Sequence, residues 1–216
     1  MTRVWPMILG GLLIAGCGTL PARAQDALDA PSTPLVYSNP NQGHATFAPV
    51  TVTLARDGDA LVAHFKVTAA TIVAKRQLAH DEYPYDFDVV ELFVRNAKSG
   101  QPGYFEFEVS PYDQSLQVNV IEPRQQYCFG IKDGFTHTAT ITATGWEAQL
   151  RIPLATIGWS GGQPLELVGN AYAALGANDQ RVYWSVFELA PGKPDFHVPG
   201  AFRPLLSSRQ RAVPGA

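Results

Sequence analysis

Aromatic rings and polar groups, two kinds of side chain suited to recognition, occur close together in this 216-residue chain. Tyr83 and Tyr85 lie in the acidic loop 81–86, where core packing is not the obvious need, and Trp184 lies in an apolar run. An aromatic face can cover the C–H patches of a sugar ring, while carboxylates, amides and guanidiniums bond its hydroxyls. The alternative for Trp184 is a place in the hydrophobic core.

Glutamates form a second set of candidates. Glu91 stands inside the apolar run 88–94, and a buried acid needs a partner, so we expect it to pair with an arginine or to line a site. Glu106 and Glu108 are two residues apart and must share one face of a strand. Paired carboxylates carry out glycoside hydrolysis, but we expect these two on the solvent face of a sheet, without a catalytic role.

The loop that precedes Glu91 is rich in acids whose oxygens could bind Ca²⁺, although their spacing matches no fixed calcium-loop motif. The candidate calcium ligands are Asp81, Asp86 and Asp88. No other cofactor is expected, because the five histidines lack the spacing of a metal site. Nucleophile elbows, phosphate loops and Cys-x-x-Cys pairs are also absent from the sequence.

The elements that must position these residues are β-strands. From residue 50 onward apolar residues recur at every second position, and turn residues interrupt them about every 8–12 residues. This pattern predicts an all-β fold, an antiparallel β-sandwich of the jelly-roll or immunoglobulin-like type, with about nine or ten strands. The expected strands are 50–54, 61–67, 88–94, 105–109, 116–120, 138–144, 146–152, 165–175 and 181–188.

Several short motifs follow one another along residues 45–205. They are Asp88–Phe93, Tyr104–Val109, Gly145–Pro153, Gly169–Tyr172, Tyr183–Ser185, and Phe196–Pro199 with Phe202. Their order and spacing resemble the family 9-like carbohydrate-binding modules, which are related to the DOMON sandwich. The resemblance implies a β-sandwich that recognises sugars without catalysis, with carbohydrate as its partner.

The resemblance also implies roles for individual residues. By motif position, Trp184 and Tyr85 match the aromatic pair that brackets the sugar, and Glu91 matches an acid used near the ligand. Asn170 falls in a matched motif, and Arg181 could reach the same site from three residues before Trp184. The full expected binding set is Trp184, Tyr85, Glu91, Asn170, Arg181, Tyr83 and Asn119.

Composition and charge narrow the possible partners. The net charge is −3 and charged residues make up 16% of the chain, which argues against nucleic acid, because such a partner requires a basic surface. Cys128 lies in an apolar neighbourhood and is expected to be a small buried hydrophobe. The sequence predicts no oligomeric state.

The first residues have the composition of a targeting segment. Residues 7–15 are an apolar run too short to span a bilayer, and a small-x-small site at 22–24 predicts a signal peptide over 1–24. The alternative is a lipoprotein signal that ends at Gly16 and leaves Cys17 lipidated. We therefore expect an exported protein, periplasmic or secreted, or an envelope lipoprotein anchored through Cys17, without a transmembrane segment after processing. Residues 25–44 are expected to be a linker or lead-in, 45–208 the sandwich domain and 209–216 a tail.

Three other functions remain open at this point. A DOMON-like sandwich can hold haem, and because Met1 and Met7 lie in the targeting segment, bis-histidine ligation is the form that stays possible. The second alternative is a glycoside hydrolase or an accessory protein of one. The third is an adhesion or assembly protein without a small ligand.

Overall fold

The computed structural model describes residues 32–37, 50–129, 134–190 and 194–206. These residues contain thirteen strands and three short 3-10 helices, with no α-helix among them. The strands are β1 (Thr33–Pro34), β2 (Val36–Tyr37), β3 (Val50–Asp57), β4 (Ala60–Thr68), β5 (Val89–Asn96), β6 (Tyr104–Val109), β7 (Ser115–Glu122), β8 (Gln126–Phe129), β9 (Thr136–Thr142), β10 (Gly145–Pro153), β11 (Leu167–Leu175), β12 (Val182–Ser185) and β13 (Arg203–Pro204). The 3-10 helices are η2 (Pro84–Asp86), η3 (Asn178–Gln180) and η4 (Pro199–Ala201).

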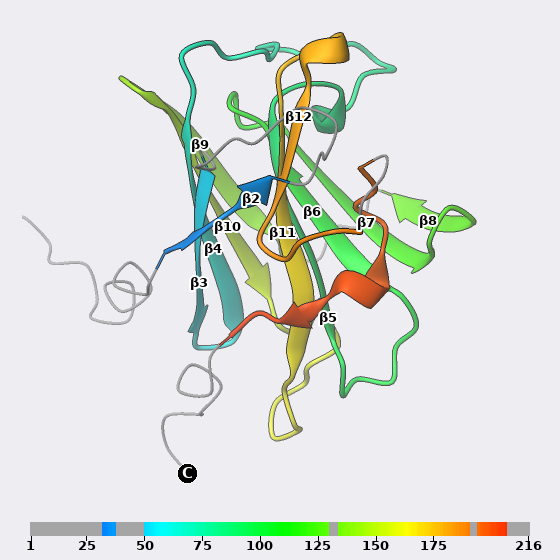
Figure 1. Cartoon of the computed structure of the whole chain (residues 1–216). Helices are drawn as coiled ribbons and strands as arrows, with labels where there is room; N and C mark the ends of the chain where they lie inside the picture. The colour runs from blue at the N-terminus through cyan, green and yellow to red at the C-terminus, as the bar shows by residue number, and fades with distance from the viewer. Residues whose placement is uncertain (1–31, 38–49, 130–133, 191–193, 207–216) are drawn as a thin grey trace, which may run out of the picture.

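Two antiparallel sheets face each other in the described part of the chain (Figure 1). The smaller sheet has the order β1-β3-β4-β10-β9. The larger sheet has the order β2-β12-β11-β5-β6-β7-β8, and β13 pairs with β11 beside this path. The predicted all-β antiparallel sandwich is therefore confirmed.

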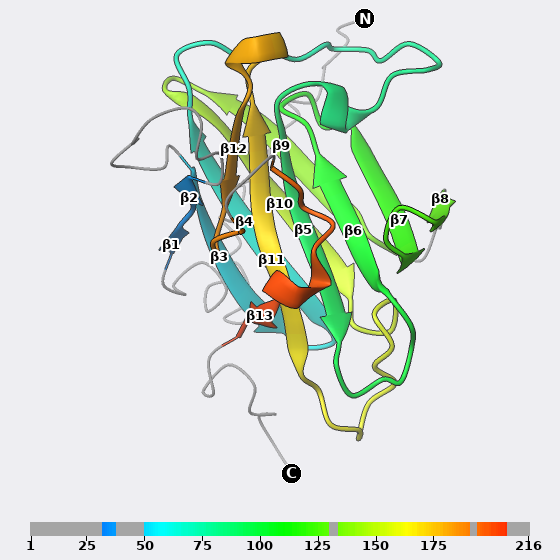
Figure 2. The same ribbon diagram turned by 45° about the vertical axis from the view of Figure 1, so that its right-hand side comes forward.

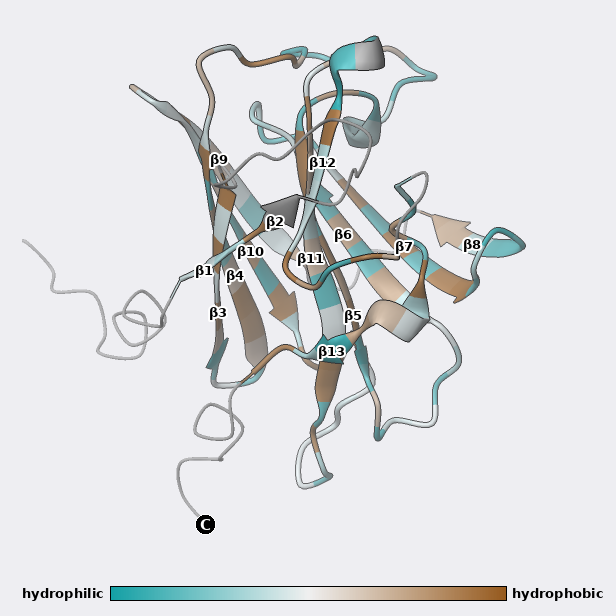
Figure 3. Ribbon diagram, viewed as in Figure 1, coloured by the Kyte–Doolittle hydropathy of each residue, from teal (hydrophilic) through white to brown (hydrophobic). Residues whose placement is uncertain are grey.

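The core lies between the two sheets and follows directly from the period of two in the sequence. Alternate residues of each strand turn inward, so Phe65 and Trp146 of the small sheet pack with Leu92 and Phe107 of the large one. Hydrophobic and hydrophilic bands succeed one another along the strands (Figure 3). β5 and β6 depart from a simple inside-outside pattern, because nearly all of their residues are buried, on both faces of the sheet.

A second apolar layer explains why those two strands are buried on both sides. The chain between β12 and β13 crosses the outer face of the large sheet, over β11 and β5 (Figure 2). There Phe196 and Phe202 pack with Phe93, Tyr104 and Tyr172, which point away from the core between the sheets. The large sheet is thus covered on its outer face by an irregular segment, and a hollow remains beside this segment.

Some expectations concern residues that the structure does not describe. The signal segment 1–24, the alternative lipidation site Cys17, the tail 209–216 and most of the lead-in 25–44 lie outside the described residues. Within the lead-in, Thr33–Pro34 pairs with β3 and Val36–Tyr37 pairs with β12, so the sandwich includes strands upstream of residue 45. None of the residues described here forms a helix long and apolar enough to cross a bilayer.

Candidate functional site

A cleft of about 760 Å³ opens on the outer face of the large sheet, beside the segment that crosses this face. Strands β5, β6, β7, β8, β11 and β12 provide its floor and sides. The loop that contains η2 and residues 194–197 provide the remaining walls. The cleft is therefore built from segments that are far apart in the sequence and that the sandwich brings together.

Alternation along β5 and β6 determines which side chains reach the cleft. Leu92 and Phe107 point into the core between the sheets, while Glu91, Glu106 and Glu108 line the cleft. The register of the two strands places Glu91 directly opposite Glu108, and cross-strand neighbours of this kind have their Cβ atoms about 4.5–5.5 Å apart. Three glutamates therefore converge at one point of the floor.

The three carboxyl groups are close together and almost completely buried. One oxygen from each of them lies within 4.8 Å of the others. The exposed fraction is 4% for Glu91, 6% for Glu106 and 0% for Glu108. No other group of three or more acidic, histidine or cysteine side chains within the described ranges has its possible ligand atoms so close together.

Burial changes the acid chemistry of this cluster. The pKa of Glu91 is raised well above its ordinary value, mainly by desolvation and then by the charge of Glu106, while Arg181 acts in the opposite direction. Desolvation likewise raises the pKa of Glu108, with Glu91 and Glu106 adding to the effect and the Tyr85 backbone opposing it. Neither oxygen of Glu108 makes a hydrogen bond of normal geometry with a protein group. The cluster therefore holds three acids at close range, and the charge of Arg181 favours the ionised form of Glu91.

Arg181 is a cleft arginine whose charge acts on Glu91. Its Nη2 donates hydrogen bonds to the backbone oxygens of Tyr85, at 2.6 Å, and Phe87, at 2.9 Å. These bonds tie the η2 loop to the start of β12. The guanidinium also lies 5.7 Å from the centre of the Tyr183 ring, within the range of a cation–π contact. Arg181 thus contacts the backbone of Tyr85 and the ring of Tyr183, which both line the cleft. Arg181 lines the cleft as well.

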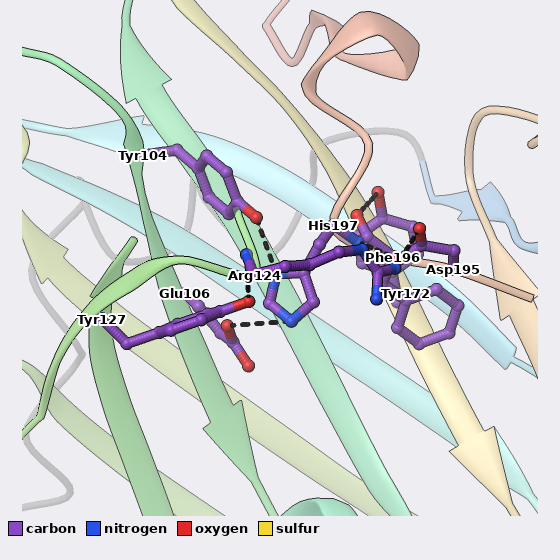
Figure 4. A network of polar contacts seen from close by, with 8 residues as sticks. All are labelled: Tyr104, Glu106, Arg124, Tyr127, Tyr172, Asp195, Phe196 and His197. Carbon is purple, nitrogen blue, oxygen red and sulfur yellow. Dashed lines mark hydrogen bonds and ion pairs between the residues drawn. The ribbon is translucent and has the colours of Figure 1, made fainter. Parts of the chain in front are cut away.

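A histidine from the crossing segment completes the floor (Figure 4). His197 Nδ1 and the Tyr104 hydroxyl are hydrogen-bonded at 2.6 Å, and His197 Nε2 lies 4.0 Å from a carboxylate oxygen of Glu106. Burial raises the pKa of Tyr104, so this hydroxyl remains a phenol that can donate to the imidazole. The histidine therefore connects a buried phenol with the acid cluster.

Charged residues on the β7–β8 turn and the crossing segment hold the far wall in place (Figure 4). Arg124 forms an ion pair with Asp195, and the backbone N–H of Arg124 donates to the Tyr127 hydroxyl at 2.6 Å. The backbone N–H of His197 donates to Asp195 Oδ1 at 3.0 Å. These contacts close the cleft on the side of β8 and leave polar atoms facing it.

Aromatic rings form the rim. Tyr85 lines the cleft and is 41% exposed, and its ring stacks on that of Tyr83 with 5.0 Å between centroids and 11° between planes. Tyr83 in turn contacts the exposed ring of Phe129. Burial and the charge of Asp86 raise the pKa of Tyr85 to about 12. The rim thus presents a continuous set of exposed or half-exposed rings beside the buried acids.

The structure corrects the expectation for Trp184. This residue lies in the core between the sheets and is 4% exposed, which is the alternative that the sequence left open. Its neighbour Tyr183 points to the other face of β12 and lines the cleft. A single residue along a strand reverses the face, so the aromatic residue of this motif that reaches the cleft is Tyr183.

Asn170 and Asn119 are not at the cleft either. Asn170 faces the outer side but is fully buried, and its amide group both donates to and accepts from the Phe187 backbone, at 2.9 and 3.0 Å. It therefore fastens the segment that follows β12. Asn119 alternates with the cleft-lining Leu116 and Val118 on β7 and so points to the opposite face. Of the seven predicted binding residues, the cleft is lined by Tyr85, Glu91 and Arg181.

The aspartates of the η2 loop do not form the predicted calcium site. Asp88 is buried, and its two oxygens accept backbone hydrogen bonds from separate loops at 2.6 and 2.9 Å. Asp86 accepts from the backbone N–H of Tyr83 at 2.8 Å, and Asp81 is exposed. These three residues are not among the side chains that converge as possible metal ligands in the described part of the chain. The hydrogen bonds of Asp86 and Asp88 hold the loop in shape.

Several cleft residues were missed by the sequence analysis. Glu106 and Glu108 were expected on a solvent face, whereas they are buried at the floor. The aromatic residues Tyr104, Phe105 and Phe107 of β6 point to both faces of the sheet, and this pattern could have indicated that the strand is covered on both sides. Arg124 and His197 lie in irregular segments, where spacing gives no indication of what they face. Among the histidines that the structure describes, His197 is the one that lines the cleft. Cys128 is half-buried rather than buried.

Comparison with solved structures places the fold in a known class. A crystal structure of a Bacteroides uniformis protein, provisionally named as carbohydrate-binding, aligns with a TM-score of 0.67 over 82% of this chain and 86% of that chain, at 18% identity. Two structures of a family 9 carbohydrate-binding module from Caldicellulosiruptor kristjanssonii, in complex with cellotriose and with glucose, align with TM-scores of 0.49. Their identities are 14% and 12%, and they cover 75% and 82% of both chains. The alignment with the Bacteroides uniformis protein shows that the two chains share a fold.

Sequence comparison gives a different set of relatives. The chain is 32% identical over 127 residues to the UPF0462 protein C4orf33 homolog of Mus musculus, and 30% identical over 133 residues to that of Rattus norvegicus. Each match covers 56% of this chain. The chain spans about three fifths of the length of these curated relatives, 62% and 59%. No protein-family model matches the sequence.

Proposed function

We propose that this protein is an exported, non-catalytic carbohydrate-binding module and that sugar binds in the cleft on the outer face of the large sheet. The observation that carries the proposal is the combination, in one open cleft, of aromatic rings at the rim and buried acids at the floor. The fold shared with a Bacteroides uniformis protein provisionally named as carbohydrate-binding supports it.

The chemistry of the cleft suits a sugar because a sugar needs two kinds of surface. Tyr85 and Tyr183 offer ring faces for the apolar C–H patches. Glu91 and Glu106 offer acceptors for hydroxyl groups, and Arg181 offers a donor. A cleft of about 760 Å³ is within the usual size of a small-molecule site. In this proposal the aromatic pair is Tyr85 with Tyr183, and Tyr83 supports Tyr85 from behind by stacking.

The acidic net charge and the cleft support a neutral glycan rather than nucleic acid as partner. Export is proposed from the apolar segment at residues 7–15 and the small-x-small site that follows it. Lipidation at Cys17 is the alternative form of the same proposal. Both can be tested by locating the protein in cell fractions and by mass spectrometry of its mature N-terminus.

Glycoside hydrolysis is a second candidate, and the acid cluster is the observation that favours it. Glu108 has a raised pKa and faces Glu91 across the strand pair, as a general acid beside a second carboxylate would. Its complete burial favours binding over catalysis, because a general acid must reach the glycosidic oxygen. Release of reducing sugar by the wild type, abolished in Glu108→Gln, would establish hydrolysis instead.

The binding proposal is tested by a glycan array followed by titration calorimetry with the best glycan. We expect Tyr85→Ala to weaken binding about tenfold or more, which is about 1.4 kcal/mol. Tyr112→Ala is the matched control, because this tyrosine packs under Arg76 outside the cleft, and it should bind like the wild type. Equal affinity of the wild type and Tyr85→Ala would contradict the placement of the sugar, and the absence of any glycan ligand would contradict the function.

A further inference from the structure

The acid cluster at the floor of the cleft has a geometry that goes beyond hydroxyl recognition. Glu91 and Glu108 are cross-strand partners, and Glu106 lies two residues before Glu108 on the same side of β6. One carboxyl oxygen from each lies within 4.8 Å of the others. All three side chains are held on strands rather than on loops, so their positions are fixed by the sheet.

Glu108 is the most deeply buried acid of the cluster. It is 0% exposed, and neither of its oxygens makes a hydrogen bond of normal geometry with a protein group. Burial of an acceptor that receives no hydrogen bond costs about 1–3 kcal/mol, and more when the group is charged. Its carboxyl group belongs to the cluster that lines the cleft, so a ligand that contacts it must enter from the cleft.

The hydrogen bonds and ion pairs described for the neighbouring cations are made with groups other than Glu108. Arg181 donates through Nη2 to two backbone oxygens of the η2 loop. His197 approaches Glu106 rather than Glu108, with 4.0 Å between Nε2 and the nearest oxygen. Arg124 forms its ion pair with Asp195 on the far wall. Three carboxyl groups therefore share one site, with the charge of Arg181 acting on Glu91.

We propose that Glu91, Glu106 and Glu108 together bind a hard divalent cation, Ca²⁺ in the first place, at the floor of the cleft. Ca²⁺ takes oxygen ligands at about 2.3–2.6 Å, so two ligands on opposite sides of the ion are about 4.6–5.2 Å apart. Three oxygens within 4.8 Å of one another have a common centre no more than about 2.8 Å from each, so small side-chain shifts bring all three to one ion. A softer metal is not expected, because the cluster has no sulfur or imidazole ligand within the group.

The position of the cluster gives the ion a function. Ca²⁺ binds six to eight oxygens, and three glutamates cannot occupy all directions when one side of the cluster opens to the cleft. The remaining positions face the space in which we have placed the sugar, and vicinal hydroxyls are oxygen ligands of the right kind. This second step rests on the proposed function, whereas binding of the cation does not.

Calorimetric titration of CaCl₂ into the full chain, freed of metal with a chelator, tests the cation site directly at neutral pH. We expect one site with a dissociation constant of about 10⁻⁵ to 10⁻³ M and at least a tenfold loss of affinity in Glu108→Gln. Glu122→Gln is the matched control, since this glutamate is exposed at the end of β7. No heat of binding in the wild type up to about 10 mM Ca²⁺, or the same affinity in both variants, would overturn the inference.

A second measurement tests the cation site without any variant, in case Glu108→Gln does not fold. Thermal unfolding of the wild type alone should show a midpoint that rises with Ca²⁺ concentration, as for any ligand bound only by the folded state. No rise would overturn the inference even if Glu108→Gln cannot be purified. Glu91→Gln, on the neighbouring strand, should reduce the rise as well, and an undiminished rise would place the ion elsewhere.

Glycan affinity measured with Ca²⁺ and with chelator separates the two proposals. We expect glycan binding to weaken at least tenfold in chelator if hydroxyls coordinate the ion. Equal affinity in both conditions would overturn the coordination of sugar by the ion. Calcium binding that depends on Glu108, without binding of any glycan, would leave the cation site standing and contradict the proposed function.

Discussion

The two faces of the large sheet are made by the same strands, and they bury very different residues. On the inner face, Leu92 and Phe107 pack against the small sheet in a continuous apolar core. On the outer face, Glu91 lies one position before Leu92 and Glu108 one position after Phe107, and both acids are also buried. Burial stabilises the inner face through its apolar side chains, whereas burial of the acids on the outer face costs hydration free energy.

The difference comes from what covers each face. A second regular sheet covers the inner face, and it supplies apolar side chains at every contact. The outer face is covered by the irregular segment between β12 and β13, which packs over part of β11 and β5 and leaves the rest as a cleft (Figure 2). Burial in this molecule therefore does not by itself mark a structural residue.

The largest expected effect concerns the inner face. Trp184→Ala should destabilise the protein by about 3–5 kcal/mol, because it opens a large cavity in the core. Tyr183→Ala, one position away on the outer face, should cost about 1 kcal/mol or less. Urea unfolding followed by tryptophan fluorescence or circular dichroism measures both. Equal stabilities of the two variants would contradict the assignment of the faces.

A smaller effect is expected where the covering segment is fastened. Asn170→Ala removes both hydrogen bonds to the Phe187 backbone and should cost about 1–3 kcal/mol, because a buried backbone amide loses its partner. Amide hydrogen exchange should show faster exchange in the segment that follows β12 and little change in β3 and β4. A uniform loss of protection across both sheets would show that the segment is not a separate layer.

The acids of the outer face predict a pH dependence. In chelator, the raised pKa of Glu108 means that the folded state holds more protons than the unfolded chain above the ordinary value of 4.5. Stability should therefore fall as the pH rises from about 4.5 through the folded-state pKa, by about 1.4 kcal/mol for each unit that separates the two values. Glu108→Gln should flatten this fall, which urea unfolding between pH 5 and 8 measures. An identical slope in Glu122→Gln and Glu108→Gln would contradict the assignment.

The sequence predicted the sandwich well because the period of two is a local property. It could not predict whether Tyr183 or Trp184 faces outward, because a shift of one residue along the strand moves every side chain to the opposite face. It placed Glu106 and Glu108 on a solvent face because the cover over β6 comes from residues 194–202, far along the chain. Asn170 was assigned to a ligand because its backbone partner at Phe187 depends on the path of that same segment.

Neighbouring residues on β12 provide the most direct test of the central claim, that the outer face of the large sheet binds carbohydrate. The measurement is the affinity for the best glycan of Tyr183→Ala and of Trp184→Phe, by titration calorimetry. We expect Tyr183→Ala to stay folded and to bind about tenfold more weakly, a loss of about 1.4 kcal/mol. Trp184→Phe should lose stability and keep the wild-type affinity. The opposite result, with affinity lost in Trp184→Phe and kept in Tyr183→Ala, would contradict the claim.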